Sequence, residues 1–303
     1  MFGWNETMWF SILTGAALKS AAVLAVAWVA ARLLRKHSAA MRHLVWTSAL
    51  AAILVLPFLS LALPALRVPM AVDLLVPAGP AFDYTTAVSG DPGAVPPTAS
   101  VWPAAALHTN GWRPDWKMWL MLLWAVGAIL ALSRMLLAYG IAWRASRSAG
   151  PFPDAGLCGA LAGALGIRRP VDVLAIKPGS MPMTFGMHAV ILMPADASAW
   201  SEEKRRVVLL HELAHVRRGD AATHLLAHAA LALYWWNPLA WTAWREFVKE
   251  RERAADDLVL NAGARASEYA GHLLEVARTT QAPPVMARAT AAAIARRPQL
   301  EAA

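Results

Sequence analysis

Long runs of apolar residues dominate the first half of the chain. Three stretches, 8–34, 44–66 and 116–142, are long enough to cross a bilayer, because a spanning helix needs about 20 mostly apolar residues. The segment 67–115 between the second and third stretches is rich in Pro, Ala, Gly and Ser and has no helical or strand period. We therefore expect three transmembrane helices, with an exposed and weakly ordered loop before the third.

The pattern changes after residue 144, where prolines begin to separate shorter segments. Residues 155–165 have a helical pattern, whereas 171–176 and 184–193 are typical of strands. A further helix is expected to begin after Ser201, a favourable N-cap that two glutamates follow in the first turn. The sequence thus predicts a mainly α membrane protein with a smaller α+β domain attached. Its expected parts are two membrane helices in 1–66, the loop 67–115, a third helix in 116–143 and the folded domain 144–303.

A further apolar stretch follows Asp220 and resembles a fourth span, but Asn237 and Pro238 interrupt it. Proline breaks the helical hydrogen-bond ladder and disfavours helix at the residue before it. Two arms of about 21 Å, 220–234 and 238–252, are then expected to fold back as a helical hairpin. Its apolar faces and the Trp and Tyr residues at the bend suit either a re-entrant hairpin or one lying at the interface.

The charge distribution predicts the orientation in the membrane. The hydrophobic share of 58% excludes an ordinary soluble protein, and the net charge is +8. The loop 32–43 carries four basic residues, whereas 67–115 carries two Arg against four Asp. By the positive-inside rule the first loop is cytoplasmic, which places the N-terminus outside and the domain after the third helix in the cytoplasm. Glu6 and the lack of early basic residues argue against a cleavable signal peptide.

The segment HELAH at 211–215 predicts a metal site. On a helix His211 and His215 are four residues apart, so both imidazoles project from one face and can share one ion. Glu212 adjoins the first ligand and is placed to act as the catalytic base on water acidified by Zn²⁺. The motif alone has modest specificity, so a third ligand is needed to complete the prediction.

The third ligand is expected in the charged run 249–260. Glu252 is preferred to Glu250, because Asp256 then lies on the same helical face and can orient a ligand imidazole. Without the upstream motif this run would be interpreted as a solvated helix with ion pairs to Arg251 or Arg253. A straight helix from His211 would place Glu252 across the bilayer, so the site depends on the break before Pro238.

Other candidate groups are weaker. His224 and His228 are also four residues apart, but no nearby carboxylate completes a second metal site, so they are interpreted as polar positions of the hairpin. Cys158 is the only cysteine, which excludes an internal disulfide and a thiolate cluster. We expect a buried side chain there. No helix-turn-helix, zinc-finger or RNA-binding motif supports direct nucleic-acid binding, despite the positive charge.

These motifs resemble the BlaR/MecR-type membrane metallopeptidases, the transducers and antirepressors of beta-lactam sensing. The resemblance covers nearly the whole chain, with RHLVWTSAL, PMTFG, VILMP, HELAHVRRGD, WWNPLAW and ERERAADDLVL in family order. It implies zinc bound by His211, His215 and Glu252, with Glu212 as base and Asp256 supporting the ligands. It also implies an edge strand, Thr184, Phe185 and Gly186, to which an extended substrate peptide adds.

The chain departs from the family pattern in two places. Ala255 stands where many members have Cys, a position that is not a ligand. The receptor members continue into an extracellular sensor after another span, whereas this sequence ends at Ala303. Either it is a fragment or sensing uses other means.

We expect a multi-pass protein of the bacterial inner membrane whose partners are the lipid bilayer and a protein or peptide substrate. The favoured hypothesis is cleavage of a cytoplasmic protein, a transcriptional repressor or the protease itself, in a BlaR/MecR-like signalling role. One alternative is a membrane housekeeping or prenyl-peptide-type metalloprotease with similar elements. An alternative of another class is a non-proteolytic membrane signalling scaffold. Substrate, inducing signal and oligomeric state do not follow from the sequence.

Overall fold

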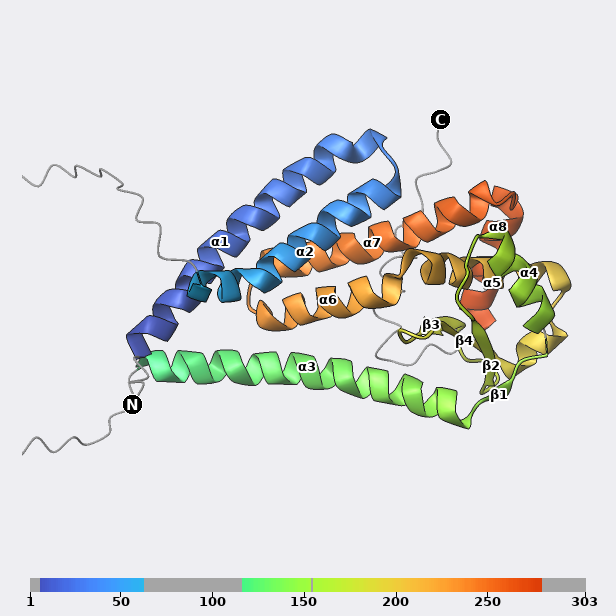
Figure 1. Ribbon diagram of the computed structural model, residues 1–303, viewed down its shortest axis with the longest axis horizontal. Coiled ribbons are helices and arrows are strands. Elements are labelled where there is room, and N and C mark those ends of the chain that lie inside the picture. The colour runs from blue at the N-terminus through green and yellow to red at the C-terminus, as the bar shows by residue number, and fades with distance from the viewer. Residues whose placement is uncertain (1–5, 63–115, 154, 280–303) are drawn as a thin grey trace, which may run out of the picture.

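The computed structural model describes residues 6–62, 116–153 and 155–279. These residues form long helices that run along most of the molecule and one small mixed sheet that lies at one end of it (Figure 1). The Pro/Ala-rich loop expected at 67–115 and the C-terminal residues from 280 lie outside them, so the structure does not bear on that loop.

Three helices have the length and composition of membrane spans, as the sequence predicted. They are α1 (Glu6–Leu33), α2 (Ala39–Ala62) and α3 (Trp116–Ser148), and the 3-10 turn η1 (Leu34–Lys36) precedes α2. Helix α3 leaves most of its apolar side chains exposed, which suits a helix that faces lipid. The described chain is thus a membrane protein with a helical bundle.

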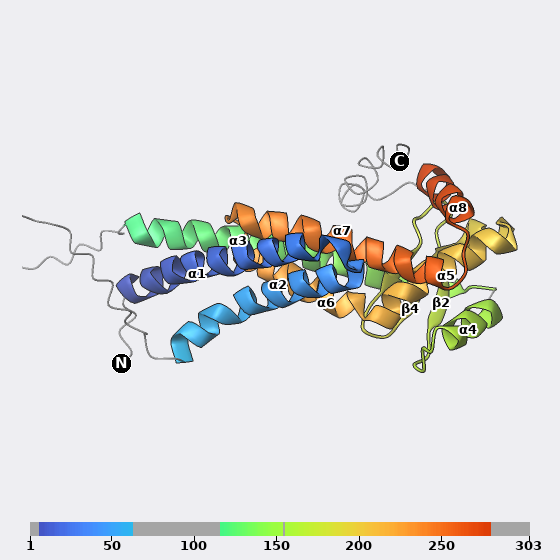
Figure 2. The same cartoon turned by 90° about the horizontal axis from the view of Figure 1, so that it is seen from above.

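Helices α6 (Asp220–Leu233) and α7 (Pro238–Asn261) lie beside the membrane helices (Figures 1 and 2). The break between them falls at Asn237 and Pro238, where the Asn237 side chain accepts a hydrogen bond from the Leu239 amide and caps α7. Small and aromatic residues of both helices form one buried cluster with α1 and α2. The close packing of the four helices depends on these small side chains: Ala16, Ala27, Ala49, Ala227, Ala230, Ala240 and Ala243.

The sheet has four strands in the order β1-β2-β4-β3, comprising β1 (Gly150–Pro151), β2 (Asp172–Ile176), β4 (Val190–Pro194) and β3 (Met183–Phe185). Strands β2 and β4 are parallel, whereas β3 and β4 are antiparallel. The prediction of one strand over 184–193 is wrong, because the chain reverses within it. Gly186 has a φ of 79°, a left-handed conformation that glycine adopts readily, and the strand ends there.

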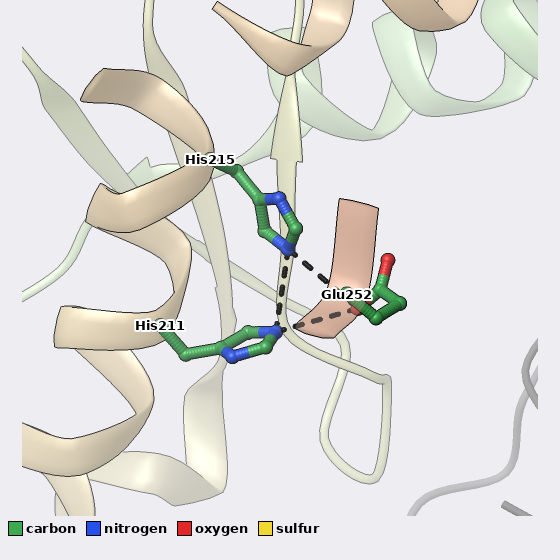
Figure 3. Close-up of side chains that lie close together, drawn as sticks. All are labelled: His211, His215 and Glu252. Atoms are coloured by element: carbon green, nitrogen blue, oxygen red, sulfur yellow. Dashed lines mark hydrogen bonds and ion pairs between the residues drawn. The ribbon is translucent and has the colours of Figure 1, made fainter. Parts of the chain in front are cut away.

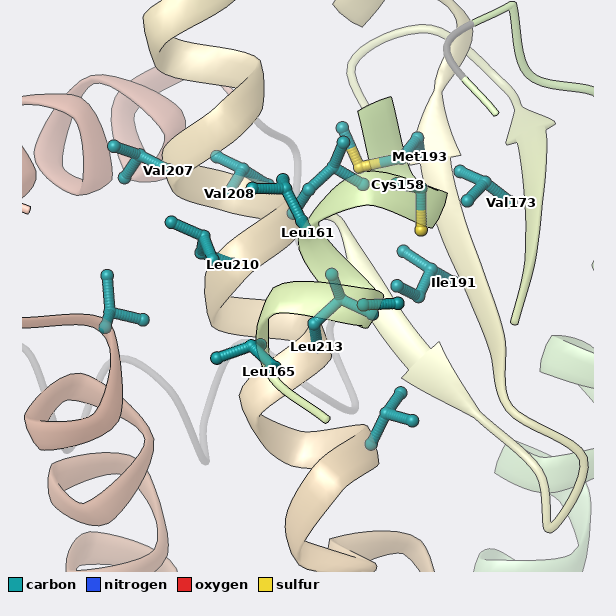
Figure 4. Packing of buried hydrophobic residues seen from close by; sticks show 14 of the residues in the cluster. Cys158, Leu161, Leu165, Val173, Ile191, Met193, Val207, Val208, Leu210 and Leu213 are labelled. Atoms are coloured by element: carbon teal, nitrogen blue, oxygen red, sulfur yellow. The ribbon is translucent and has the colours of Figure 1, made fainter. Parts of the chain in front are cut away.

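Helical segments complete the smaller domain: α4 (Ala155–Ala164), the 3-10 segment η3 (Ala195–Ala199), α5 (Glu202–Arg218) and α8 (Ala266–Thr279), of which α4 and α5 contact the sheet and α8 packs on α5. Their apolar side chains interlock with those of β4 (Figure 4). Cys158 of α4 is 1% exposed within this core, which confirms the expected buried thiol. The core fixes one face of α5, so the opposite face is free to carry polar groups.

Candidate metal centre

Helix α5 carries the HELAH segment between well-defined ends. The Ser201 hydroxyl accepts a hydrogen bond from the Lys204 amide, so Ser201 is the N-cap that the sequence predicted. The helix ends at Gly219, whose φ of 68° lets its amide donate to the carbonyls of His215 and Val216. Because α6 begins at the next residue, Asp220 lies next to the last turn of α5.

Three side chains from α5 and α7 converge at one point (Figure 3). The Nε2 atoms of His211 and His215 are 3.3 Å apart. An oxygen of Glu252, Oε2, lies 3.6 Å from Nε2 of His211 and 3.7 Å from Nε2 of His215. Ligands of a tetrahedral zinc ion lie about 3.3 Å from one another, so these distances suit one small cation.

The other oxygen of Glu252 has a separate partner. Its Oε1 accepts hydrogen bonds from Nε and Nη2 of Arg251, at 3.0 and 2.6 Å. The ion pair within α7 that could explain a charged helix therefore exists, but it occupies only one of the two carboxylate oxygens. The remaining oxygen faces the two imidazoles.

Each imidazole is held through its Nδ1 atom. Nδ1 of His215 lies 2.7 Å from Oδ2 of Asp220, a carboxylate that is 3% exposed. Nδ1 of His211 lies 2.8 Å from the Tyr269 hydroxyl, which donates to Asp256 at 2.6 Å. Asp256 itself lies 3.5 Å from Nδ1 of His211, so it acts on that imidazole both directly and through Tyr269. With Nδ1 engaged, each ring presents Nε2 to the shared point.

Glu212 points toward strand β3 and is 6% exposed. The Thr184 hydroxyl donates to its carboxylate at 2.7 Å and lies 3.0 Å from its carbonyl oxygen. Thr184, which the resemblance assigned to substrate binding, thus contacts the expected base with its side chain. A carboxylate held in this way cannot swing freely, and its orientation beside His211 is fixed.

The electrostatics of the cluster favour positive charge. Burial alone would lower the pKa of His211, but hydrogen bonds to Asp256 and Glu252 outweigh it and raise that pKa to about 10. Burial alone would raise the pKa of Glu252, but Arg251 and the two histidines hold it well below its usual range. The carboxylates therefore attract a cation to the point where the Nε2 atoms meet, which is the field that a divalent metal needs.

The donor set fits zinc. Two imidazoles and one carboxylate are the ligands of many catalytic zinc sites, which keep a fourth position open for water or substrate. Asp220 and Tyr269 supply the outer contacts that fix ligand orientation. Among the described residues no other group of three or more metal-binding side chains has this geometry. The rings of His224 and His228 contact each other, with centroids 4.5 Å apart, and Arg251 donates to His224.

The remaining residues of the expected substrate strand lie where β3 approaches α3. The Phe185 ring packs on that of Tyr139, with centroids 4.7 Å apart. Gly186 ends the strand, and a Cβ there would meet the carbonyl oxygen of His188 at 3.3 Å. Strand β3 is the outermost strand of the sheet in the described part of the chain, so its far side has no strand partner there.

Sequence reasoning did not identify Asp220 or Tyr269. Asp220 directly follows Gly219, the residue that ends the metal-binding helix. This glycine is the local signal that the next side chain lies close to that helix. Tyr269 lies on α8, far from the motif in sequence, and no local pattern indicates its contact with His211.

Sequence similarity to a known family extends over nearly the whole chain. Residues 11–299 match the family model described as BlaR1 peptidase M56. A stretch of 80 residues is 38% identical to the regulatory protein BlaR1 of Bacillus licheniformis, covering 26% of this chain and 13% of that protein. The chain spans only a small part of that relative's length. Since the family model covers nearly all of the sequence, the chain belongs to the BlaR1 peptidase M56 family, whose members are membrane-associated metallopeptidases.

Proposed function

We propose that this chain is an integral membrane zinc endopeptidase in which His211, His215 and Glu252 bind the metal and Glu212 is the catalytic base. The observation that carries the proposal is the convergence of three donor atoms from two helices, each within 3.7 Å of the others. Membership of a metallopeptidase family supports the same conclusion.

The residues have separate tasks in hydrolysis. When bound, Zn²⁺ supplies Lewis acidity that lowers the pKa of water and polarises a carbonyl. Glu212 accepts the proton of the attacking water and then donates it to the leaving amine. The Thr184 hydroxyl holds the Glu212 carboxylate in place for both transfers. Asp220 and Tyr269 keep the two imidazoles aligned.

The substrate is an extended protein segment that adds to the outer edge of β3. A strand at the edge of a sheet offers unpaired amides and carbonyls, and main-chain pairing leaves side-chain choice loose. The hydrogen bond from the Thr184 side chain to the Glu212 carboxylate supports this assignment, because it joins strand β3 to the proposed base. We infer cleavage of a cytoplasmic protein, either a transcriptional repressor or the chain itself, because the motifs of the chain resemble those of the BlaR/MecR-type transducers and antirepressors.

The hairpin of α6 and α7 is re-entrant. Its bend contacts residues in the middle of the membrane helices: the Tyr234 hydroxyl donates to the Ile53 carbonyl at 3.0 Å, and the Asn237 amide to the Ser20 hydroxyl at 3.4 Å. These contacts support a bend within the bilayer rather than at its surface, since unsatisfied polar groups are costly there. The metal ligands lie at the opposite end of the hairpin, where Glu250 of α7 pairs with Arg42, a residue of the basic loop that we assign to the cytoplasmic side.

Replacing Glu212 by Gln tests the mechanism. The variant keeps the size of the side chain but cannot accept a proton, so we expect cleavage to be lost while zinc remains bound at one equivalent. The assay uses the full chain in lipid nanodiscs, with peptide cleavage measured by mass spectrometry and zinc by elemental analysis. Cleavage by Glu212→Gln would contradict the assigned base, and a wild-type chain without zinc would favour a signalling scaffold.

A further inference from the structure

The first turn of α2 contacts both halves of the metal centre. Two consecutive residues of this membrane helix, Arg42 and His43, are partly or fully buried against the middle of α7 and the end of α5. Their partners are 208 and 175 residues away in sequence. Neither residue belongs to the ligand set, and both are polar groups in an otherwise apolar helix, so their burial needs an explanation.

Arg42 holds α7. Its Nε and Nη2 atoms lie 2.9 and 2.8 Å from Oε2 of Glu250, two residues before Glu252. The Glu250 side chain is 4% exposed, whereas that of its other partner, Arg253, is 50% exposed. Arg42 also donates to the carbonyls of Arg35 and His37 and thus joins the turn before α2 to the same carboxylate. A buried charge pair of this geometry fixes the position of the helix that carries Glu252.

His43 holds the junction of α5 and α6. Arg218 donates through Nη2 to Nδ1 of His43 at 3.0 Å and through Nε to both oxygens of Asp220 at 3.2 Å. Asp220 in turn lies 2.7 Å from Nδ1 of His215. A continuous chain of hydrogen bonds therefore connects α2 with a metal-binding imidazole. The His43 ring also packs on Phe247 of α7, with centroids 4.8 Å apart.

We propose that Arg42 and His43 are positioning residues for the metal centre, so that the placement of the membrane helix α2 sets how tightly the ligands hold the metal. The inference rests on the proposed zinc site and adds a regulatory contact to it. A shift of α2 pulls on α7 through Glu250 and on His215 through Arg218 and Asp220. The Glu252 carboxylate and the His215 imidazole are then displaced relative to His211, whose own support comes from α8.

Zinc affinity of variants at His43 tests this contact. His43→Phe keeps a ring against Phe247 but removes the acceptor for Arg218, so we expect zinc affinity to fall about 10-fold to 100-fold. His43→Asn carries an oxygen near the position of Nδ1 and is expected to restore affinity to within about threefold. The matched control is Arg253→Ala, which removes the exposed partner of Glu250 and leaves α2 untouched.

The measurement uses the full chain in nanodiscs, with competition against a chromophoric zinc chelator. The visible spectrum of the Co²⁺-loaded protein reports ligand geometry independently of activity. Folding is checked by size exclusion and tryptophan fluorescence. If His43→Phe does not fold, the double variant Arg42→Gln with Glu250→Gln takes its place, because joint replacement leaves no uncompensated buried charge.

Wild-type affinity and an unchanged Co²⁺ spectrum in the decisive variant would overturn the inference. A loss of affinity equal in Arg253→Ala and His43→Phe would overturn it as well, since the effect would not depend on α2. Failure of the wild-type chain to bind zinc is a different result, because it would refute the proposed function and not the contact between α2 and the site.

Discussion

Gly127 of α3 lies against the hairpin of α6 and α7, so replacing it by Ala tests how the hairpin packs on α3. A Cβ at Gly127 would overlap Cε2, Cζ2 and Nε1 of the Trp235 indole, which sits at the bend between α6 and α7. That indole donates from Nε1 to the Trp124 carbonyl at 3.1 Å, and Trp124 donates to the Leu233 carbonyl at 3.0 Å. Moving the indole away from an added Cβ would therefore break its hydrogen bond.

The magnitude follows from these contacts. Overpacking of a tight interface costs about 1–3 kcal/mol, and the lost indole hydrogen bond adds about 0.5–1.5 kcal/mol. The higher helix propensity of alanine offsets at most about 1 kcal/mol. We expect Gly127→Ala to lower the free energy of unfolding by about 0.5–4.5 kcal/mol, net of that gain. Gly140 of the same helix has no described atom within 4 Å of an added Cβ, so Gly140→Ala is a matched control.

The assay is thermal unfolding of both variants in the same detergent, followed by tryptophan fluorescence. Gly127→Ala should unfold several degrees below wild type, and Gly140→Ala at or slightly above it. Equal midpoints for the two variants would refute the packing of the bend against α3. Zinc affinity should fall in parallel in Gly127→Ala, since Glu252 reaches the site at the other end of this hairpin.

Three further changes test the smaller domain. Thr184→Val removes the hydrogen bond to Glu212 and should lower kcat about 10-fold to 100-fold with little change in KM. Thr184→Ser keeps the hydroxyl and should keep most activity. A normal kcat in the valine variant would contradict the role of Thr184 in holding Glu212. Tyr269→Phe leaves Nδ1 of His211 without its hydroxyl partner and should weaken zinc binding about 10-fold, measured by competition with a chelator. An unchanged zinc affinity would contradict this role of Tyr269. Burial raises the pKa of the Cys158 thiol from 9.0 to about 11, so at pH 8 its reactive thiolate should be about 100-fold scarcer than in the denatured chain. Labelling with a thiol reagent should therefore be slow until denaturant is added, and should accelerate as the pH rises toward that pKa.

Local periodicity accounts for the parts of the fold that the sequence predicted. Apolar runs of membrane length are visible without any tertiary information, and they correspond to α1, α2 and α3. The helix after Ser201 and the break at Pro238 are also local effects, set by a capping hydroxyl and a missing amide. The helix by itself is enough to turn two imidazoles at helical spacing toward one point.

The missed features depend on contacts between distant residues or on a single backbone angle. The turn at Gly186 divides a segment whose apolar composition suits one strand, and only its positive φ reveals the reversal. The pairing of Arg42 with Glu250 joins residues 208 positions apart, and nothing in either neighbourhood indicates the other. Asp256 was expected to orient a ligand imidazole, and it lies 3.5 Å from Nδ1 of His211, but the Tyr269 hydroxyl that bonds to both residues was not foreseen.

The hairpin between the membrane helices also bears on when the enzyme becomes active. Glu252 reaches the two histidines only through arms whose apolar faces are buried against α1 and α2. In water these faces would have no partner, so we expect the proposed ligand set to assemble only after the first two helices have paired. Membrane insertion would then precede peptidase activity, and a chain that has not yet inserted would leave the proteins around it uncleaved.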